Sequence, residues 1–141
     1  MTHVNATAVG LFNTLTGATA LTGLLTLGTA GVFQDLAPEG AVPPYVVFNA
    51  QSPSVPQYTY TAVAFENTIY QVKGVTQGPS KAAGGTIAHQ IDAALNDAAV
   101  TVTGYTLLKC RRLQDVDFTE VVSGVRFSHI GGLFRVWVDP T

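Results

Sequence analysis

Two apolar stripes with helical spacing, each followed by a block of β-branched and aromatic residues, constrain the fold more than any other feature. The members of the first stripe recur every three or four residues: Val4, Ala8, Leu11, Phe12 and Leu15. The second stripe consists of Ile87, Ile91, Ala94 and Leu95. This spacing puts apolar side chains on one face of a helix. It predicts one amphipathic helix that ends near Gly17 and another that opens after Gly78, with Ser80 as its candidate N-cap.

The blocks after the two helices carry strand patterns. The first block predicts strands at 45–49, 58–65 and 68–75, with a hairpin turn at Glu66-Asn67. The second predicts strands at 105–113, 121–130 and 133–138. Strands grouped in this way favour an antiparallel sheet over alternating βαβ units. The predicted fold class is α+β, an antiparallel sheet with two main helices packed on one face, in one domain over residues 1–141.

The apolar faces of these elements predict the hydrophobic core. Its expected members are Leu11, Leu15, Val47, Ile87, Ile91, Leu95, Phe134 and Val136.

Three segments are expected to be loops. Residues 35–44 contain the turn signal Pro38-Glu39-Gly40. Residues 51–57 contain prolines that cannot donate to a sheet ladder, which predicts an exposed loop. A third loop, which contains three carboxylates, is predicted around Asp115, Asp117 and Glu120.

The chain carries few charges. Asp, Glu, Lys and Arg make up 11% of it, against about 25% in an ordinary soluble domain. Either its surface is neutral and rich in hydroxyl groups, or much of it is buried against other subunits. The net charge is −2, and the only cation cluster is Lys109, Arg111 and Arg112. This composition argues against a dedicated nucleic-acid-binding protein, because such proteins neutralise phosphates with many cations.

The sequence predicts no catalytic, cofactor or metal site. Neither Gly-rich segment has the Lys-Ser/Thr of a phosphate loop, and no nucleophile elbow or zinc-ligand spacing occurs. The acidic segment lacks the glycine and spacing of a calcium loop. Alternation places Cys110, the single cysteine, on the face of Leu108 and opposite Lys109 and Arg111, which predicts a small buried hydrophobe. We therefore expect a protein that is not an enzyme.

The N-terminus has no basic region of a signal peptide, and the apolar stretch 21–27 is too short to span a bilayer. We expect no membrane partner and synthesis in a cytoplasm.

Charged and proline-containing segments are the candidates for subunit or partner contact. They are Pro53, Val55, Pro56, Arg111, Arg112, Asp115, Asp117 and Glu120. Arg111 and Arg112 are expected on opposite faces of a strand, where each could join subunits or remain solvated. The predicted loop around Asp115, Asp117 and Glu120 could likewise be solvated or meet a partner.

The chain resembles the tail-completion proteins of long-tailed bacteriophages. The resemblance begins with Val32-Phe33-Gln34-Asp35, continues through Pro38-Glu39-Gly40, and reaches Pro44-Tyr45-Val46-Val47-Phe48. A helix over 82–95 then ends in Asp92-Ala93-Ala94-Leu95, and Phe127, His129 and Phe134-Arg135-Val136-Trp137-Val138 follow. These markers cover most of the chain and are structural rather than catalytic.

The resemblance implies a virion protein that forms a homo-oligomeric ring of six, caps the finished tail tube and meets a head-neck connector protein. It implies no cofactor and no sequence-specific nucleic acid, although DNA could pass through the ring. The low charge of this chain is a departure that leaves the polarity of such a channel open. Two alternatives remain: a head-side neck protein, and a small α+β ligand-binding or hydrolytic module, against which the missing motifs count.

Overall fold

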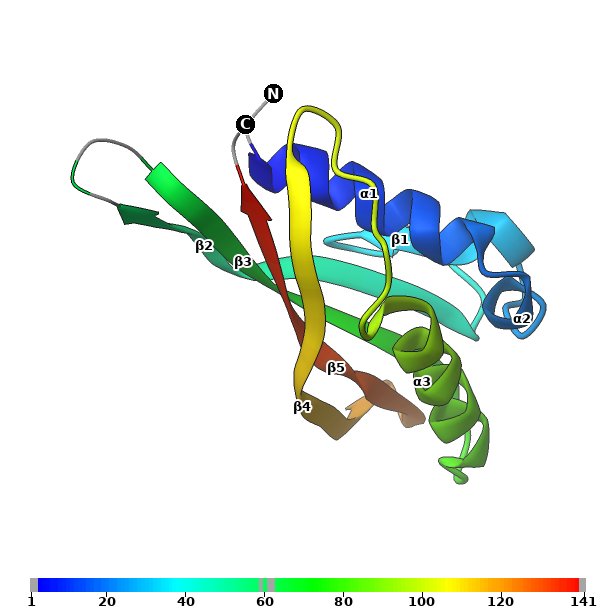
Figure 1. Ribbon diagram of the computed structural model, residues 1–141. Helices are drawn as coiled ribbons and strands as arrows, with labels where there is room; N and C mark the ends of the chain where they lie inside the picture. Colours follow the sequence, from blue (N-terminus) through cyan, green and yellow to red (C-terminus); the bar gives the residue numbers. More distant parts are fainter. Residues whose placement is uncertain (1–2, 59, 61–62, 140–141) are drawn as a thin grey trace.

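The computed structural model describes residues 3–58, 60 and 63–139, without the side chains of residues 3, 52–58 and 63. Its elements are α1 (His3–Gly17), α2 (Thr19–Thr22), η1 (Gly28–Gly31), β1 (Val32–Gln34), β2 (Tyr45–Tyr58), β3 (Val63–Gln77), α3 (Ala82–Leu95), β4 (Thr106–Val122) and β5 (Val125–Asp139). The strands form one sheet in the order β1-β2-β3-β5-β4. Figure 1 shows α1 and α3 on the same face of this sheet. The predicted α+β class is confirmed.

The short strand β1 was not predicted, and it makes the sheet mixed. β1 pairs parallel to β2, with Val32 opposite Val46, whereas the other strand pairs are antiparallel. Three residues give too short a pattern for strand periodicity to be recognised in a sequence. β1 forms because α2 and η1 return the chain to the edge of β2.

The core lies between the two helices and the sheet. All eight residues predicted for the core are buried. Seven belong to the helix-side cluster, but Val47 does not, because its strand neighbours Val46 and Phe48 occupy that face. Val47 instead points to the helix-free face, where it lines a cavity with Leu36 and Ala37. The first stripe also has one exposed member, Phe12, at the border of the helix face.

Residues 51–57 are not the predicted loop but part of β2. They pair with β3, with Val55 opposite Asn67 and Pro56 opposite Glu66. β1 covers β2 only as far as Phe48, so the later part of β2 is an edge, where proline is tolerated. The register shifts three times along this part of the strand, as expected where prolines interrupt the ladder.

The predicted turn at Glu66-Asn67 was also wrong, because both residues lie inside β3. β2 ends at Tyr58 and β3 begins at Val63, so the reversal falls between them, partly outside the described residues. The resulting hairpin extends past the helices, as Figure 1 shows. Glu66 and Asn67 are both only partly buried in β3.

The acidic segment around Asp115, Asp117 and Glu120 is strand rather than loop. β4 and β5 form a long hairpin that reverses at Ser123 and Gly124, with φ values of 51° and 80°. Two residues with positive φ match the right-handed twist of paired strands, and this turn was not recognised in the sequence. Carboxylates are acceptable in β4 because it is an edge strand.

The start of α3 packs tightly against the sheet. The N-cap of α3 is Lys81 rather than the predicted Ser80, and its side chain makes no capping hydrogen bond. The Ser80 hydroxyl oxygen, one residue earlier, accepts a hydrogen bond from the Ala82 backbone N–H at 3.2 Å. A Cβ on Gly84 would lie 2.9 Å from Ile130 Cδ1, whereas a Cβ on Gly85 would meet nothing within 4 Å. Close packing therefore explains why a glycine is needed at position 84 but not at position 85.

We expect Leu95→Ala to lower the free energy of unfolding by about 2–5 kcal/mol, because the side chain is fully buried between α3 and the sheet. Urea denaturation of the purified protein measures this. The matched control, measured like Leu95→Ala on the dissociated subunit, is Leu36→Ala, since Leu36 is 83% exposed and should unfold like the unmodified chain. Equal midpoints for the two variants would contradict the assignment of the core face.

We expect the two adjacent glycines of α3 to respond differently to alanine. Gly85→Ala should raise the free energy of unfolding by about 1 kcal/mol, the difference in helix propensity, because its Cβ enters open space. Gly84→Ala should lose part or all of that gain, since Ile130 must move. Thermal denaturation of both variants tests this, and a Gly84→Ala protein as stable as Gly85→Ala would contradict the close packing.

Candidate functional site

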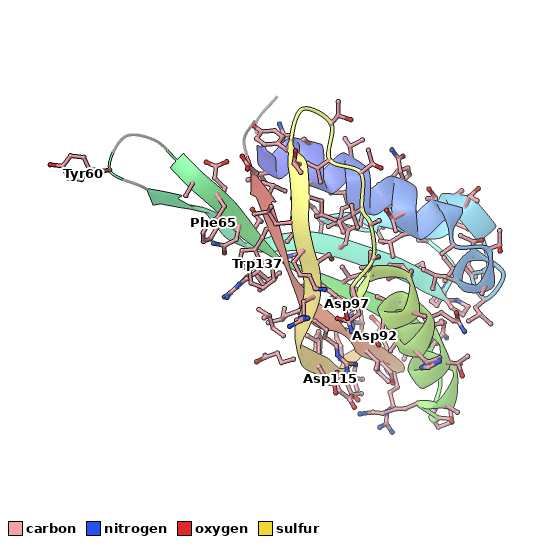
Figure 2. The ribbon with its side chains drawn as sticks, in the orientation of Figure 1. Tyr60, Phe65, Asp92, Asp97, Asp115 and Trp137 are labelled. Carbon is pink, nitrogen blue, oxygen red and sulfur yellow. The ribbon has the colours of Figure 1, made fainter. Side chains whose placement is uncertain are left out.

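A groove between α3 and β4 holds most of the charges predicted for partner contact. Lys81 Nζ lies 2.8 Å from Asp117 Oδ1. Arg112 bridges Asp92 on α3 at 3.4 Å and Asp115 on β4 at 3.3 Å. Figure 2 shows Asp92 at α3 and Asp115 further along β4. The structure therefore gives Arg112, Asp115 and Asp117 partners within the chain, and all of these pairs remain at least partly exposed.

The groove contains a cavity of about 290 Å³, and the apolar residues that line it include Ile130 and Phe134. His89 and Asp92 are the titratable groups of α3 that line it. No cluster of three His, Cys, Asp or Glu that could hold a metal occurs among the described residues. The arrangement is an ion-paired seam between a helix and a sheet edge.

Cys110 is buried in the core, as predicted, but not for the predicted reason. An irregularity between Leu107 and Lys109 leaves Leu108 as an extra residue in β4, exposed to solvent. Cys110 therefore shares the core face with Leu107, across from Val136. Burial, assisted by the charge of Asp97, raises the pKa of the thiol to about 12. A thiol in this state is not a nucleophile near neutral pH.

The helix-free face of β4 and β5 carries a second group of side chains, here called the cationic patch. It consists of three cations, Lys109, Arg111 and Arg135, and the ring of Trp137. Arg111 lies directly opposite Arg135 in the ladder, and Lys109 lies opposite Trp137. The Arg135 guanidinium stands 5.5 Å from the centre of the Trp137 ring. Figure 2 shows Trp137 on the side of these strands away from α3. Arg111 and Arg112 thus face opposite sides, as expected.

Among the described residues, a single carboxylate forms salt bridges with the cationic patch. Asp97, which follows α3, lies 2.8 Å from Lys109 Nζ and 3.5 Å from an Arg111 nitrogen. These cations hold the pKa of Asp97 below its usual value, the hydrogen bond from Lys109 being the largest cause. Arg135 forms no such pair with another described residue, and its buried Nε makes no hydrogen bond among them.

Glu120 belongs to a cluster of rings and charges on the same helix-free face. Its carboxylate lies 3.4 Å from His129 Nε2, and His129 stacks on Phe118 with ring centres 4.4 Å apart. Lys73 Nζ stands 4.9 Å from the centre of the Phe118 ring. Burial, and then the charge of Lys73, lower the pKa of His129. His129 is thus a buried neutral ring near neutral pH.

The side chains of Pro53, Val55 and Pro56 lie outside the described residues, so their predicted contact role stays a prediction. Tyr60 lies at the end of the same hairpin, and its side chain is fully exposed. Figure 2 shows it pointing away from the rest of the molecule.

The sequence contains two signals for these clusters. Arg135 and Trp137 alternate with buried residues of β5, which places both on one outer face. Asp97 follows the end of α3, where it can reach the β4 edge. Neither signal identifies its cross-strand neighbours, because the irregularities of β4 shift the register.

Comparison with known families gives the decisive observation. The model of the family "Tail completion protein gp17" matches residues 9–139. The chain belongs to this family. The resemblance in its sequence is thereby confirmed, and the chain is a structural protein of the phage tail, located in the virion.

A solved structure supports the fold of this tail completion protein. A chain from the "Virion of native gene transfer agent (GTA) particle" superposes with a TM-score of 0.69. It is 18% identical in sequence, and the match covers 92% of this chain and 91% of that chain. At this identity the likeness establishes the shared fold. No match was found among curated proteins. No helix among the described residues is long and apolar enough to cross a membrane.

We expect the tail completion protein to lose stability as the pH falls below about 6.5, the usual pKa of histidine, because His129 has a lowered pKa in the fold. The neutral ring is favoured when folded, so its stabilisation is complete above the unfolded pKa. It declines once the pH drops below that value of about 6.5, and the decline levels off below the folded pKa. One such group contributes up to about 1.4 kcal/mol per pH unit.

Urea denaturation at a series of pH values measures this slope. His129→Phe should flatten it, because a phenyl ring keeps the stacking on Phe118 without titrating. The matched control is His89→Gln, a change at an exposed position of α3 that should keep the slope. A slope that is the same in His129→Phe and in the unmodified protein would contradict the assignment.

Proposed function

We propose that this tail completion protein closes the phage tail as a ring of six identical subunits. The ring caps the tail tube protein on one side and meets a head-neck connector protein on the other, and DNA passes through it. Each subunit is one domain over residues 1–141 and acts by assembly rather than by catalysis. The observation that carries the proposal is the family match over residues 9–139.

The surface of the subunit supports burial in an assembly. The exposed large apolar side chains among the described residues are Val9, Phe12, Leu24, Leu27, Leu36, Val42, Tyr60, Leu108, Leu113, Phe118, Val121 and Val122. Charged residues make up 11% of the chain, less than half of the usual fraction of about 25%. A lone subunit would therefore expose much apolar surface with little charge to keep it soluble.

Two open sheet edges support a head-to-tail arrangement. On one side, β1 pairs with β2 only at Val46, Val47 and Phe48. On the other side, the segment after α3 covers β4 at Cys110 and Arg112. From 113 to 122, the described residues form no backbone hydrogen bond to β4 from outside the sheet. Edges at opposite sides of one sheet allow each subunit to offer different surfaces to its two neighbours, as ring closure requires.

The test measures the mass of the assembled protein and its position in the virion. Light scattering and native mass spectrometry of the concentrated protein should show a closed species of six subunits, alone or on isolated tail tubes. Cryo-electron microscopy of the virion should place that ring at the head-proximal end of the tube. Strictly monomeric protein that also occurs as isolated copies in the particle would refute the ring. A position on the head side would instead identify a neck protein.

A further inference from the structure

We propose that the cationic patch of one subunit binds the loop between β1 and β2 of a second copy of this chain. The loop, here called the acidic loop, comprises residues 35–42 and includes Asp35, Leu36, Glu39 and Val42. The inference rests on the proposed ring and adds to it the two surfaces that meet.

The cationic patch is electrostatically incomplete within the subunit. Arg111 and Arg135 face each other across the ladder, and like charges in this position repel. Asp97 is the one carboxylate that the described residues place within salt-bridge distance of the patch, and it is shared by Lys109 and Arg111. Three cations against one carboxylate leave an excess of two positive charges beside an aromatic ring. Such a surface fits an apolar group flanked by carboxylates, and arginine and tryptophan often dominate interface energies.

The acidic loop has the complementary composition. It contains two carboxylates and no cation. Neither Asp35 nor Glu39 forms a salt bridge with another described residue. Leu36 is 83% exposed and Val42 is 52% exposed. Leu36 can therefore pack on Trp137 of a second copy while the carboxylates meet the guanidinium groups of Arg111, which shares Asp97 with Lys109, and of Arg135, which has no carboxylate partner among the described residues.

The acidic loop is also held in shape, which lowers the cost of ordering it on binding. The Asp35 backbone N–H donates to the Phe48 carbonyl at 2.8 Å, and the Leu36 N–H donates to the Gln34 carbonyl at 2.8 Å. Its turn is closed by the Ala41 N–H, which donates to the Pro38 carbonyl at 3.1 Å.

The positions of the two surfaces suit a ring. The acidic loop follows β1 at one edge of the sheet, whereas the cationic patch lies on β4 and β5 at the other. Contact between unlike surfaces at opposite edges repeats from copy to copy and can close on itself. DNA phosphates would satisfy the charges of the patch but would leave Leu36 and Val42 exposed, so a second copy is the better occupant.

Reciprocal charge reversal tests this pairing. Arg135→Glu and Glu39→Lys should each weaken self-association about tenfold in sedimentation velocity, because each creates like charges across the contact. A 1:1 mixture of the two variants should restore it to within about threefold, because in an alternating ring every contact again joins opposite charges. Arg126→Glu, an exposed charge reversal on β5 outside the patch, is the matched control and should associate normally.

Folding is checked on the same samples. Arg135→Glu places a carboxylate opposite Arg111, so the melting midpoint of the dissociated subunit should not fall. If Arg135→Glu nevertheless unfolds, Arg135→Gln is used in its place. It removes the positive charge without adding a negative one, and it should still weaken association.

The outcomes separate this inference from the proposed function. Rings that tolerate both reversals, or a mixture that fails to recover, would overturn the pairing while leaving the ring intact. Duplex DNA binding that is lost in Arg135→Glu, with normal rings, would assign the patch to phosphates and also overturn it. If unmodified protein associates only on tails, the same variants are supplied singly and together to tails that lack the protein. Rescue by the pair alone supports the pairing, and rescue by either variant refutes it.

Discussion

The close approach of α3 to the sheet is the constraint on which the rest of the structure depends. A Cβ on Gly74 of β3 would lie 2.5 Å from Ile87 Cγ2, and one on Gly84 of α3 would lie 2.9 Å from Ile130 Cδ1. Glycines on both partners thus let the isoleucines of each fill the space beside the other. Close-packed interiors of this kind resist displacement, so the helix is held at a defined depth and position.

That position decides which charges are satisfied within the subunit. Because α3 lies beside β4, Asp92 and Lys81 meet Arg112 and Asp117, and the helix-side seam is paired. None of the described helices covers the opposite face, where the ladder places Arg111 against Arg135. The subunit is therefore electrostatically complete on one side and incomplete on the other.

The hairpins follow from the same one-sided packing. β2 and β3 continue past the helices, and β4 and β5 continue to a tight turn at Ser123 and Gly124 (Figure 1). The segment of β4 before this turn leaves the apolar side chains of Val121 and Val122 exposed, and Tyr60, between β2 and β3, is exposed as well.

The sequence by itself determined the two main helices with their buried faces, the α+β class and the family. Leu11, Leu15, Ile87 and Leu95 repeat with helical spacing over several turns, and such a local pattern does not depend on what packs against it. Only the tertiary structure decided the strand bounds, the face of Val47 and the partners of the charges. Edge position lets residues 51–57 and the acidic segment be strand despite prolines and carboxylates. The irregularities of β4 set which side chains face each other, and a one-residue shift in register moves a side chain to the other face. Pairings such as Arg111 with Arg135 join residues far apart in the chain, so no local pattern contains them.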